Sequence, residues 1–380
     1  MSTQLQLLVD AAEFWAALRR DIRAARHRIW LQTLSFEADS AGLPLAEALL
    51  QSEARDQRLL VDAFSQHIIS DRFIHAPRNL LRPELRAEVR ATRDMFDRLR
   101  SHGAHIGITN PAGWLWHRLP SRDHRKLVLI DDEIAYIGGI NFSEHNFAWH
   151  DLMIRIEGAE VANFLREDFA ATWRGQPFHA AARFAGIELH NLSGQGNEPR
   201  TEPTLQVIRQ ARRSIIAITP YLTFPFTDAM AEARRNGAAV TVLSPAINNR
   251  VSLRRYVHRL AHQHGFELRH YLGRMSHLKA LLIDDEVVVT GSTNFDWPTY
   301  HVLAETIAII DAPAFVHDFR ERVVQADLRA SVPIRPESSI AGRYAELQHR
   351  AWAWGARTIG RPRNGKRVVH CGGAPDCRVE

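Results

Sequence analysis

The hydrophobic positions of the chain form short runs that alternate with segments of helical spacing. Apolar runs at 28–36 and 214–222 each follow a helix-like segment, which predicts a helix leading into a strand. Strands are also expected at 127–130, 152–157 and 306–310, and helices at 159–174 and 312–327. Every apolar run is shorter than the roughly 18 residues that span a bilayer, so no transmembrane helix is expected.

The pattern repeats along the chain. Residues 124–141 read HRKLVLIDDEIAYIGGIN, and residues 277–294 read HLKALLIDDEVVVTGSTN, at a constant offset of 153. Because the flanking strand and helix patterns repeat as well, the sequence predicts two copies of a mixed α/β unit.

The repeat divides the chain into a first domain at 1–187, a linker at 188–203, a second domain at 204–331 and a basic extension at 332–380. The first half is longer, which places an arginine-rich insertion around 66–98. We interpret it as a surface helix packed on its own domain, with a lid or a membrane-touching element as the alternative. The extension is expected to be partly disordered, with Trp352 and Trp354 docking the segment before it.

Composition narrows the classes of protein to which the chain can belong. The 380 residues are 45% hydrophobic and 24% charged, which is ordinary for a globular protein with more than one domain. The net charge of +5 suits contact with polyanions, so phospholipid head groups and nucleic acid both stay open. Cys371 and Cys377 fit neither a zinc knuckle nor a disulfide framework. The amino-terminal pattern is not that of a signal peptide, so a cytoplasmic location is expected.

Each repeat places a histidine and a lysine two positions apart. If these residues lie in a strand, His124 and Lys126 share one face. The second copy offers His277 and Lys279 in the same way. A lysine supplies charge to a phosphate oxygen, and a histidine near neutral pH serves as nucleophile, base or acid. The paired motifs therefore predict one phosphate-handling site.

The duplicated motif, HxKxxxxD followed by Gly-Gly or Gly-Ser and Asn, resembles that of the phospholipase D superfamily over roughly residues 15–330. The resemblance implies two similar α/β/α domains related by a pseudo-twofold axis, with the active site at their interface. The residues that carry it are His124, Lys126, Asp131, Gly138, Gly139 and Asn141, then His277, Lys279, Asp284, Gly291, Ser292 and Asn294.

The resemblance also implies a mechanism that needs no metal and no cofactor. One histidine attacks phosphorus to form a phosphohistidine, while the other protonates the leaving alcohol. It assigns His124 as the nucleophile and His277 as the acid. Charge on the phosphoryl oxygens would be held by Lys126, Lys279, Asn141 and Asn294, with Gly139 and Ser292 in support.

Four carboxylates complete the candidate site. Asp131 and Asp284 belong to the motif, but their seven-residue separation from the histidines points to the opposite strand face, which favours a structural role. Asp151 and Glu305 follow the two motifs at similar distances, and we expect them to orient an imidazole through its second nitrogen. The alternative is that they are ordinary strand-end charges.

The extended strings around both motifs resemble cardiolipin synthases and related phosphatidyltransferases. This predicts phosphatidyl transfer on phosphatidylglycerol at the inner face of the cell membrane. The chain would attach peripherally through the arginine-rich insertion, the basic tail or a tryptophan-rich rim at 113–119. A hydrolytic phospholipase D and a nuclease are the alternatives, and the oligomeric state is open. A dead scaffold is disfavoured, since no motif residue is missing.

Three histidines near the first motif raise the question of a metal. His117, His145 and His150 fit no common ligand spacing, so we expect no metal there. They are interpreted as solvated or head-group-contacting residues.

Overall fold

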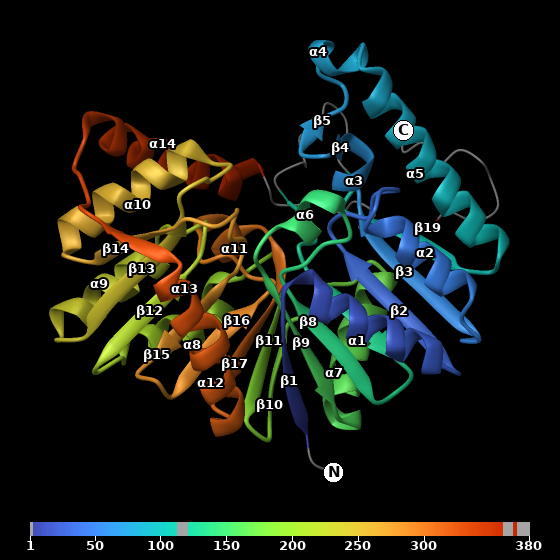
Figure 1. The fold of residues 1–380 in the computed structure, drawn as a ribbon, viewed down its shortest axis with the longest axis horizontal. Helices are drawn as coiled ribbons and strands as arrows, with labels where there is room; N and C mark the ends of the chain where they lie inside the picture. Colours follow the sequence, from blue (N-terminus) through green and yellow to red (C-terminus); the bar gives the residue numbers. More distant parts are fainter. Residues whose placement is uncertain (1–2, 112–120, 360–367, 371–380) are drawn as a thin grey trace. The chain divides into compact units, whose positions relative to one another are not determined.

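The computed structural model describes residues 3–111, 121–359 and 368–370. The chain forms two compact units. One consists of Met1–Ala148, Met153–Phe178 and Pro362–Glu380, and the other of Trp149–Leu152 and His179–Arg361. Each unit is built around one large β-sheet (Figure 1).

The sheet of the first unit has eight strands. Its centre is parallel across β2, β3 and β6, and antiparallel across β2, β7, β8 and β9. In spatial order the strands are β1 (Gln4–Val9), β9 (Leu152–Glu157), β8 (Ile134–Gly138), β7 (Leu127–Ile130), β2 (Arg28–Thr33), β3 (Asp56–Asp62), β6 (His105–Thr109) and β19 (Val368–His370).

The sheet of the second unit repeats this order strand for strand after one additional edge strand, β10 (Ala180–Phe184). The predicted duplication is therefore confirmed, and it extends to β1 at the edge of the first sheet and its counterpart β11 in the second. The remaining strands in order are β11 (Ile187–Ser193), β17 (Ala304–Ile310), β16 (Val287–Gly291), β15 (Ala280–Ile283), β12 (Ser214–Ile218), β13 (Ala239–Pro245), β14 (Glu267–Tyr271) and β18 (Ser331–Ile334).

Helices cover both faces of the first sheet. Apolar residues of α1 (Asp10–Ala24), α2 (Gly42–Leu50) and α5 (Pro83–Ser101) join alternate strand residues in one core. On the other face, Phe169 of α7 (Ala159–Trp173) stacks on Trp30 at 4.9 Å. The shorter helices are α3 (Phe64–His67), α4 (Pro77–Leu80) and α6 (Glu144–Ala148), and β4 (Ile68–Ile69) pairs with β5 (Arg72–Phe73).

The second unit has the corresponding layers. Helices α8 (Glu198–Arg209), α9 (Phe226–Arg235) and α10 (Val251–His264) share a core with the strands. Helix α12 (Pro313–Phe319) packs on β16 and continues through a π-helical turn, Arg320–Val324, into α13 (Gln325–Arg329). The remaining helices are α11 (Trp297–His301) and α14 (Ile340–Ile359). The expected mixed α/β class is confirmed.

The segment expected to be a linker, 188–203, forms most of β11 and the first half of α8. The apolar residues of β11, Ile187, Leu189 and Leu192, are buried, and β11 pairs with β17 along its whole length. Glu, His and Asn interrupt the alternation of apolar and polar residues that is typical of a strand, so the sequence pattern indicated a loop.

Within its described residues, the C-terminal region contains β18, α14 and β19. Trp352 is 50% exposed and its ring meets that of His349 edge-on at 5.4 Å, and Trp354 is 70% exposed. The tryptophan-rich stretch 113–119, His117, Cys371 and Cys377 lie outside the described residues. Within the described parts, none of the helices has both the length and the apolar character needed to cross a bilayer.

Candidate active site

The two His-Lys pairs lie just ahead of strands rather than inside them. His124 and Lys126 precede β7, and the backbone enters the sheet ladder only at Leu127. The same holds before β15, where His277 and Lys279 are found. All four side chains are buried. Each lysine ammonium turns back to the carbonyl of its own histidine, at 2.6 Å for Lys126 and His124.

A buried charge network holds the backbone on either side of His124. Arg125 contacts both oxygens of Asp123, at 3.0 and 3.1 Å, and also the carboxylate of Asp168 on α7. Although burial acts to lower the pKa of Arg125, the two carboxylates raise it. Asp123 and Arg125 alternate with His124 and Lys126 along the chain, so their side chains lie on the opposite side of the backbone.

A second set of contacts ties this segment to neighbouring strands. Asp62, at the end of β3, pairs with Arg122 at 2.8 Å and accepts the backbone N–H of Asp123 at 2.7 Å. Gln32 of β2 donates to Asp123 at 2.7 Å. The sequence did not single out Asp62, Asp123 or Gln32, although polar residues at the ends of otherwise apolar strands are a usable signal. Arg122 was expected to meet anionic head groups, but it is buried against Asp62.

In the second unit, a short parallel bridge fixes the segment around Asp151 beside His277. The backbone N–H of His277 donates to the carbonyl of His150 at 2.7 Å, and that of His150 donates to Met275 at 2.9 Å. The His150 ring lies 3.1 Å from Asp327 and stacks on Tyr271. His150 is buried, so its interpretation as a solvated residue is wrong.

This bridge brings three motif-related groups into contact. His277 Nδ1 lies 2.8 Å from Asp151 Oδ2 and 2.7 Å from Lys279 Nζ, and Lys279 lies 3.6 Å from Asp151. An ionised Asp151 favours the tautomer in which Nδ1 carries the proton and donates it to the carboxylate. The second ring nitrogen, Nε2, is then left for chemistry.

The charges of this group depend on one another. Burial acts to raise the pKa of Asp151, but Lys279 and His277 outweigh it and lower that pKa below its ordinary value. Burial lowers the pKa of Lys279 to about 8, against the opposing effect of Asp151, Glu305 and Asp296. At neutral pH the pair is therefore a carboxylate beside an ammonium.

Two aromatic rings flank the His277 imidazole. The Trp149 ring centroid lies 5.0 Å from it, and that of Tyr221 lies 5.9 Å away, edge-on. Both rings come from segments directly attached to the site, since Trp149 precedes the bridge and Tyr221 follows β12. Sequence reasoning missed both. The His277 side chain between them is buried, so little water reaches the imidazole.

The glycine and serine after the second motif fit closely against β17. Gly291 has φ +139°, and a Cβ atom there would stand 2.2 Å from the carbonyl oxygen of Thr306. The Ser292 hydroxyl donates to Glu305 and accepts the N–H of Thr306 at 3.0 Å. Glu305 also accepts from the hydroxyl of Thr299 at 3.3 Å. Glu305 thus anchors the loop that carries Asn294.

The two motif asparagines differ in their contacts. Asn141 donates to Asn146 at 3.2 Å and accepts from Thr33 at 3.4 Å, with Gly139 buried nearby in sequence. The Oδ1 atom of Asn294 is buried, and none of the residues that the structure describes hydrogen-bonds to it. A buried polar atom of this kind is costly unless a ligand or water satisfies it, which fits a binding role for Asn294.

The motif aspartates lie at the far ends of their strands. About seven extended residues, roughly 20 Å, separate each from its histidine. Asp131 accepts three backbone N–H groups, from residues 26, 27 and 28, and Asp284 accepts those of 212, 213 and 214. Burial acts to raise the pKa of each carboxyl, but these N–H donors lower it. Both aspartates fasten the turn that begins β2 or β12.

Replacing Asp131 with alanine is expected to destabilise the first unit by about 1–3 kcal/mol, because three backbone donors lose their acceptor. Turnover per folded molecule should stay close to that of the unchanged protein. Denaturant unfolding and activity, measured on the same preparation, check this. A large loss of turnover without a change in stability would restore Asp131 to the catalytic set.

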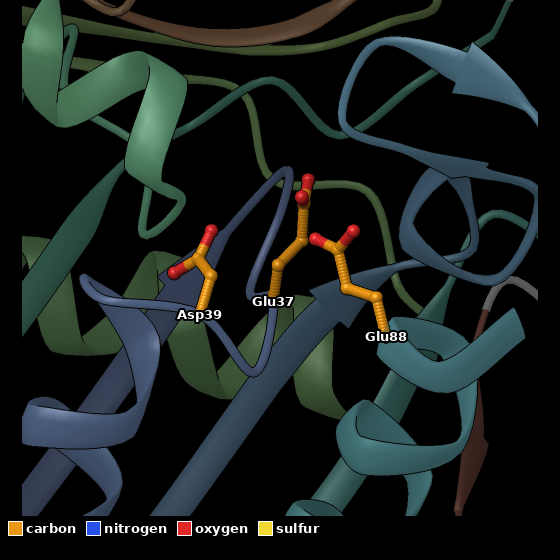
Figure 2. Close-up of side chains that lie close together, drawn as sticks. All are labelled: Glu37, Asp39 and Glu88. Atoms are coloured by element: carbon orange, nitrogen blue, oxygen red, sulfur yellow. The ribbon is translucent and has the colours of Figure 1, made fainter. Parts of the chain in front are cut away.

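Three carboxylates gather elsewhere in the first unit, from the loop after β2 and from α5 (Figure 2). Oxygens of Glu37, Asp39 and Glu88 lie within 4.8 Å of one another. Burial raises the pKa of Glu37 to about 8, offset by the N–H of Ser70 and reinforced by Asp39 and Glu88. Glu37 therefore holds a proton at neutral pH, and the cluster is partly neutralised by that proton.

This proton makes stability depend on pH. Between its ordinary pKa of 4.5 and about 8, folded Glu37 is protonated while unfolded Glu37 is ionised. Stability must then fall as pH rises through this window, by at most about 1.4 kcal/mol per pH unit. Unfolding measured from pH 5 to 9 should show a shallower decline in Glu37→Gln. The exposed Glu160→Gln serves as the control, and an equal slope in both variants would contradict the assignment.

Comparison with known proteins agrees with this architecture. The profile of a family described as "Cardiolipin synthase, PLD-like domain" matches residues 18–173 and 204–326. Cardiolipin synthase 1 of Bacillus anthracis is 25% identical over 372 residues, covering 88% of this chain and 68% of that protein. Cardiolipin synthase B of Salmonella typhi is 26% identical over 347 residues, with 84% and 79% covered.

Solved structures share the fold. The crystal structure of phosphatidylserine synthase from Haemophilus influenzae Rd KW20 has a TM-score of 0.67 at 14% identity, covering 94% of each chain. Polyphosphate kinase from Porphyromonas gingivalis has a TM-score of 0.59 at 13% identity, covering 93% of this chain and 53% of the kinase. Because the family profile matches both repeats, this chain belongs to the cardiolipin synthase, PLD-like domain family and is an enzyme of the phospholipase D superfamily.

Proposed function

We propose that this enzyme transfers a phosphatidyl group from one phosphatidylglycerol molecule to another through a phosphohistidine, without a metal. The observation that carries the proposal is the buried His277, which Asp151 and Lys279 contact through the same ring nitrogen. The choice of lipid is supported by relatives that are named cardiolipin synthases. The products would be cardiolipin and glycerol.

The proposed reaction has two steps. His124 Nε2 attacks phosphorus, a P–N bond forms, the P–O bond to glycerol breaks, and His277 gives its proton to the departing glycerol oxygen. A hydroxyl of the second phosphatidylglycerol then gives its proton to His277 and attacks phosphorus, which releases His124. Lys126, Lys279, Asn141 and Asn294 would stabilise the charge on the phosphoryl oxygens.

The surroundings of His277 support its role as the acid. A carboxylate that accepts Nδ1–H stabilises the imidazolium form, and Asp151 is placed to do so. His124 would have to be neutral to attack, so the two histidines need different environments. The rings of Trp149 and Tyr221 support transfer over hydrolysis, because water competes with the acceptor alcohol for the same intermediate.

The proposal includes attachment to the inner face of the cell membrane, where the substrate would be found. The net charge of +5 favours a surface that contains anionic lipids. Phosphatidyl hydrolysis and nucleic-acid cleavage are the competing activities of the same motif.

A direct assay separates these activities. The purified enzyme is incubated in EDTA with phosphatidylglycerol vesicles and, separately, with DNA, and products are identified by mass spectrometry against His124→Ala. Cardiolipin and glycerol that are absent from the variant support the proposal. Phosphatidic acid alone would make the enzyme a hydrolase, and DNA cleavage with intact lipid would make it a nuclease.

A further inference from the structure

Helix α14 carries large apolar side chains on its solvent face. Ile340, Tyr344 and Leu347 are 87%, 67% and 67% exposed. With Trp354, which is 70% exposed, they recur at helical spacing and fall within an arc of about 80°. We call these four residues the α14 stripe.

The opposite face of α14 packs on its own unit. Helix α14 lies beside α10 (Figure 1). Ala345, His349, Ala353 and Ala356 are buried, and Ala345 joins Tyr256 and Leu260 of α10 in a small core. The helix therefore turns its small residues inward and its large apolar residues outward, which reverses the usual order. A gathered set of exposed apolar side chains marks an interaction surface.

The charges beside the stripe favour an anionic partner. Arg343 is exposed and lies next to it on the helix, and Arg350 follows two turns later on the same side. The one acidic residue of α14, Glu346, lies away from the stripe and pairs with Arg259 at 2.7 Å and with Arg350 at 3.4 Å. Tyrosine and tryptophan are the side chains that favour the boundary between lipid and water.

We propose that the α14 stripe docks on the surface of a bilayer that contains anionic phospholipid, with the helix lying along the interface. Aliphatic and aromatic side chains would enter the head-group boundary, and the exposed Arg343 would meet lipid phosphates. The inference rests on the proposed function only for the choice of a lipid surface over a protein.

The test measures binding without turnover. Full-length His277→Ala is mixed with phosphatidylglycerol/phosphatidylcholine vesicles, and the bound fraction is measured by flotation. Leu347→Gln and Tyr344→Gln, added to this background, should each weaken binding about ten-fold, because a buried apolar side chain is lost. Leu43→Gln is the matched control, since Leu43 is 46% exposed on α2 of the other unit. Vesicles of phosphatidylcholine alone should bind less.

The outcomes separate this inference from the proposed function. If Leu347→Gln and Tyr344→Gln bind vesicles as well as Leu43→Gln does, the inference fails. A second outcome is that the parent protein does not bind vesicles but forms a dimer, and that these variants dissociate the dimer. The stripe would then join two copies of the chain, and the lipid assignment would also fail. Vesicle binding that depends on the stripe, in an enzyme that leaves phosphatidylglycerol intact, would uphold docking while rejecting the transfer reaction. Unchanged thermal unfolding of each variant excludes misfolding.

Discussion

Asp151→Asn is expected to lower kcat for phosphatidyl transfer by about 10²- to 10⁴-fold while changing KM little. The amide keeps the shape of the side chain but can no longer accept the Nδ1 proton as an anion. His277 would lose the stabilisation of its imidazolium form and the tautomer that leaves Nε2 for chemistry. Steady-state kinetics on short-chain phosphatidylglycerol measure both parameters.

Asp327→Asn is the matched control for this effect. Asp327 is also a buried carboxylate beside a histidine of the same bridge, but that histidine is His150, which carries no proposed chemistry. The variant should lose stability and retain most of its turnover. A pH–rate profile adds a second readout, because only Asp151→Asn should move the limb assigned to the acid. Equal losses of kcat in the two variants would mean that Asp151 merely supports the fold.

The sequence was sufficient to predict the repeat and several central strands of both sheets, namely β2, β7, β9, β12 and β17. These strands are continuous apolar runs, buried on both faces, and a duplicated motif marks the same strand twice. Strand 152–157 was predicted at the residues where β9 is found. Strand β11 was harder to predict, because Glu188, His190 and Asn191 interrupt its apolar residues and make the segment resemble a loop by composition.

The residues of the site could be predicted only where a functional residue also has a regular place in the sequence motif. The His-Lys pairs follow from the motif, and Asp151 could be proposed because it ends the loop before a predicted strand. The tertiary contacts could not be predicted. The bridge between His150 and Ser276 joins segments more than a hundred residues apart, and no local pattern specifies it. The same limitation explains why Trp149 and Tyr221 were overlooked.

The motif aspartates show how a motif can mislead. In both motifs the aspartate follows the histidine at the same distance, which suggests shared chemistry. The carboxylate of Asp131 nevertheless accepts backbone N–H groups at the other end of β7. A residue that fastens a turn is constrained in position as tightly as one that touches a substrate. Whether the aspartate fastens a turn or touches the substrate depends on the end and the face of the strand at which it lies. The only signal of this in the sequence was the odd number of residues, seven, between the histidine and the aspartate.

His124→Ala and His277→Ala should both abolish phosphatidyl transfer, by about 10⁴- to 10⁶-fold, and therefore cannot be told apart on the natural substrate. A soluble p-nitrophenyl phosphodiester separates them, because nitrophenolate leaves without needing a proton. In His277→Ala the nucleophile is intact, so we expect a burst of about one equivalent of nitrophenolate followed by little turnover. His124→Ala should give no burst.

The stalled His277→Ala enzyme should carry a phosphohistidine at position 124, detectable by mass spectrometry of peptides kept at alkaline pH. A burst in His124→Ala alone, with the phosphoryl group on His277, would exchange the two roles and leave Asp151 orienting the nucleophile. The absence of a burst and of a covalent adduct in both variants would reject the two-step mechanism altogether. The position of the adduct therefore decides whether the carboxylate beside His277 assists proton donation or attack.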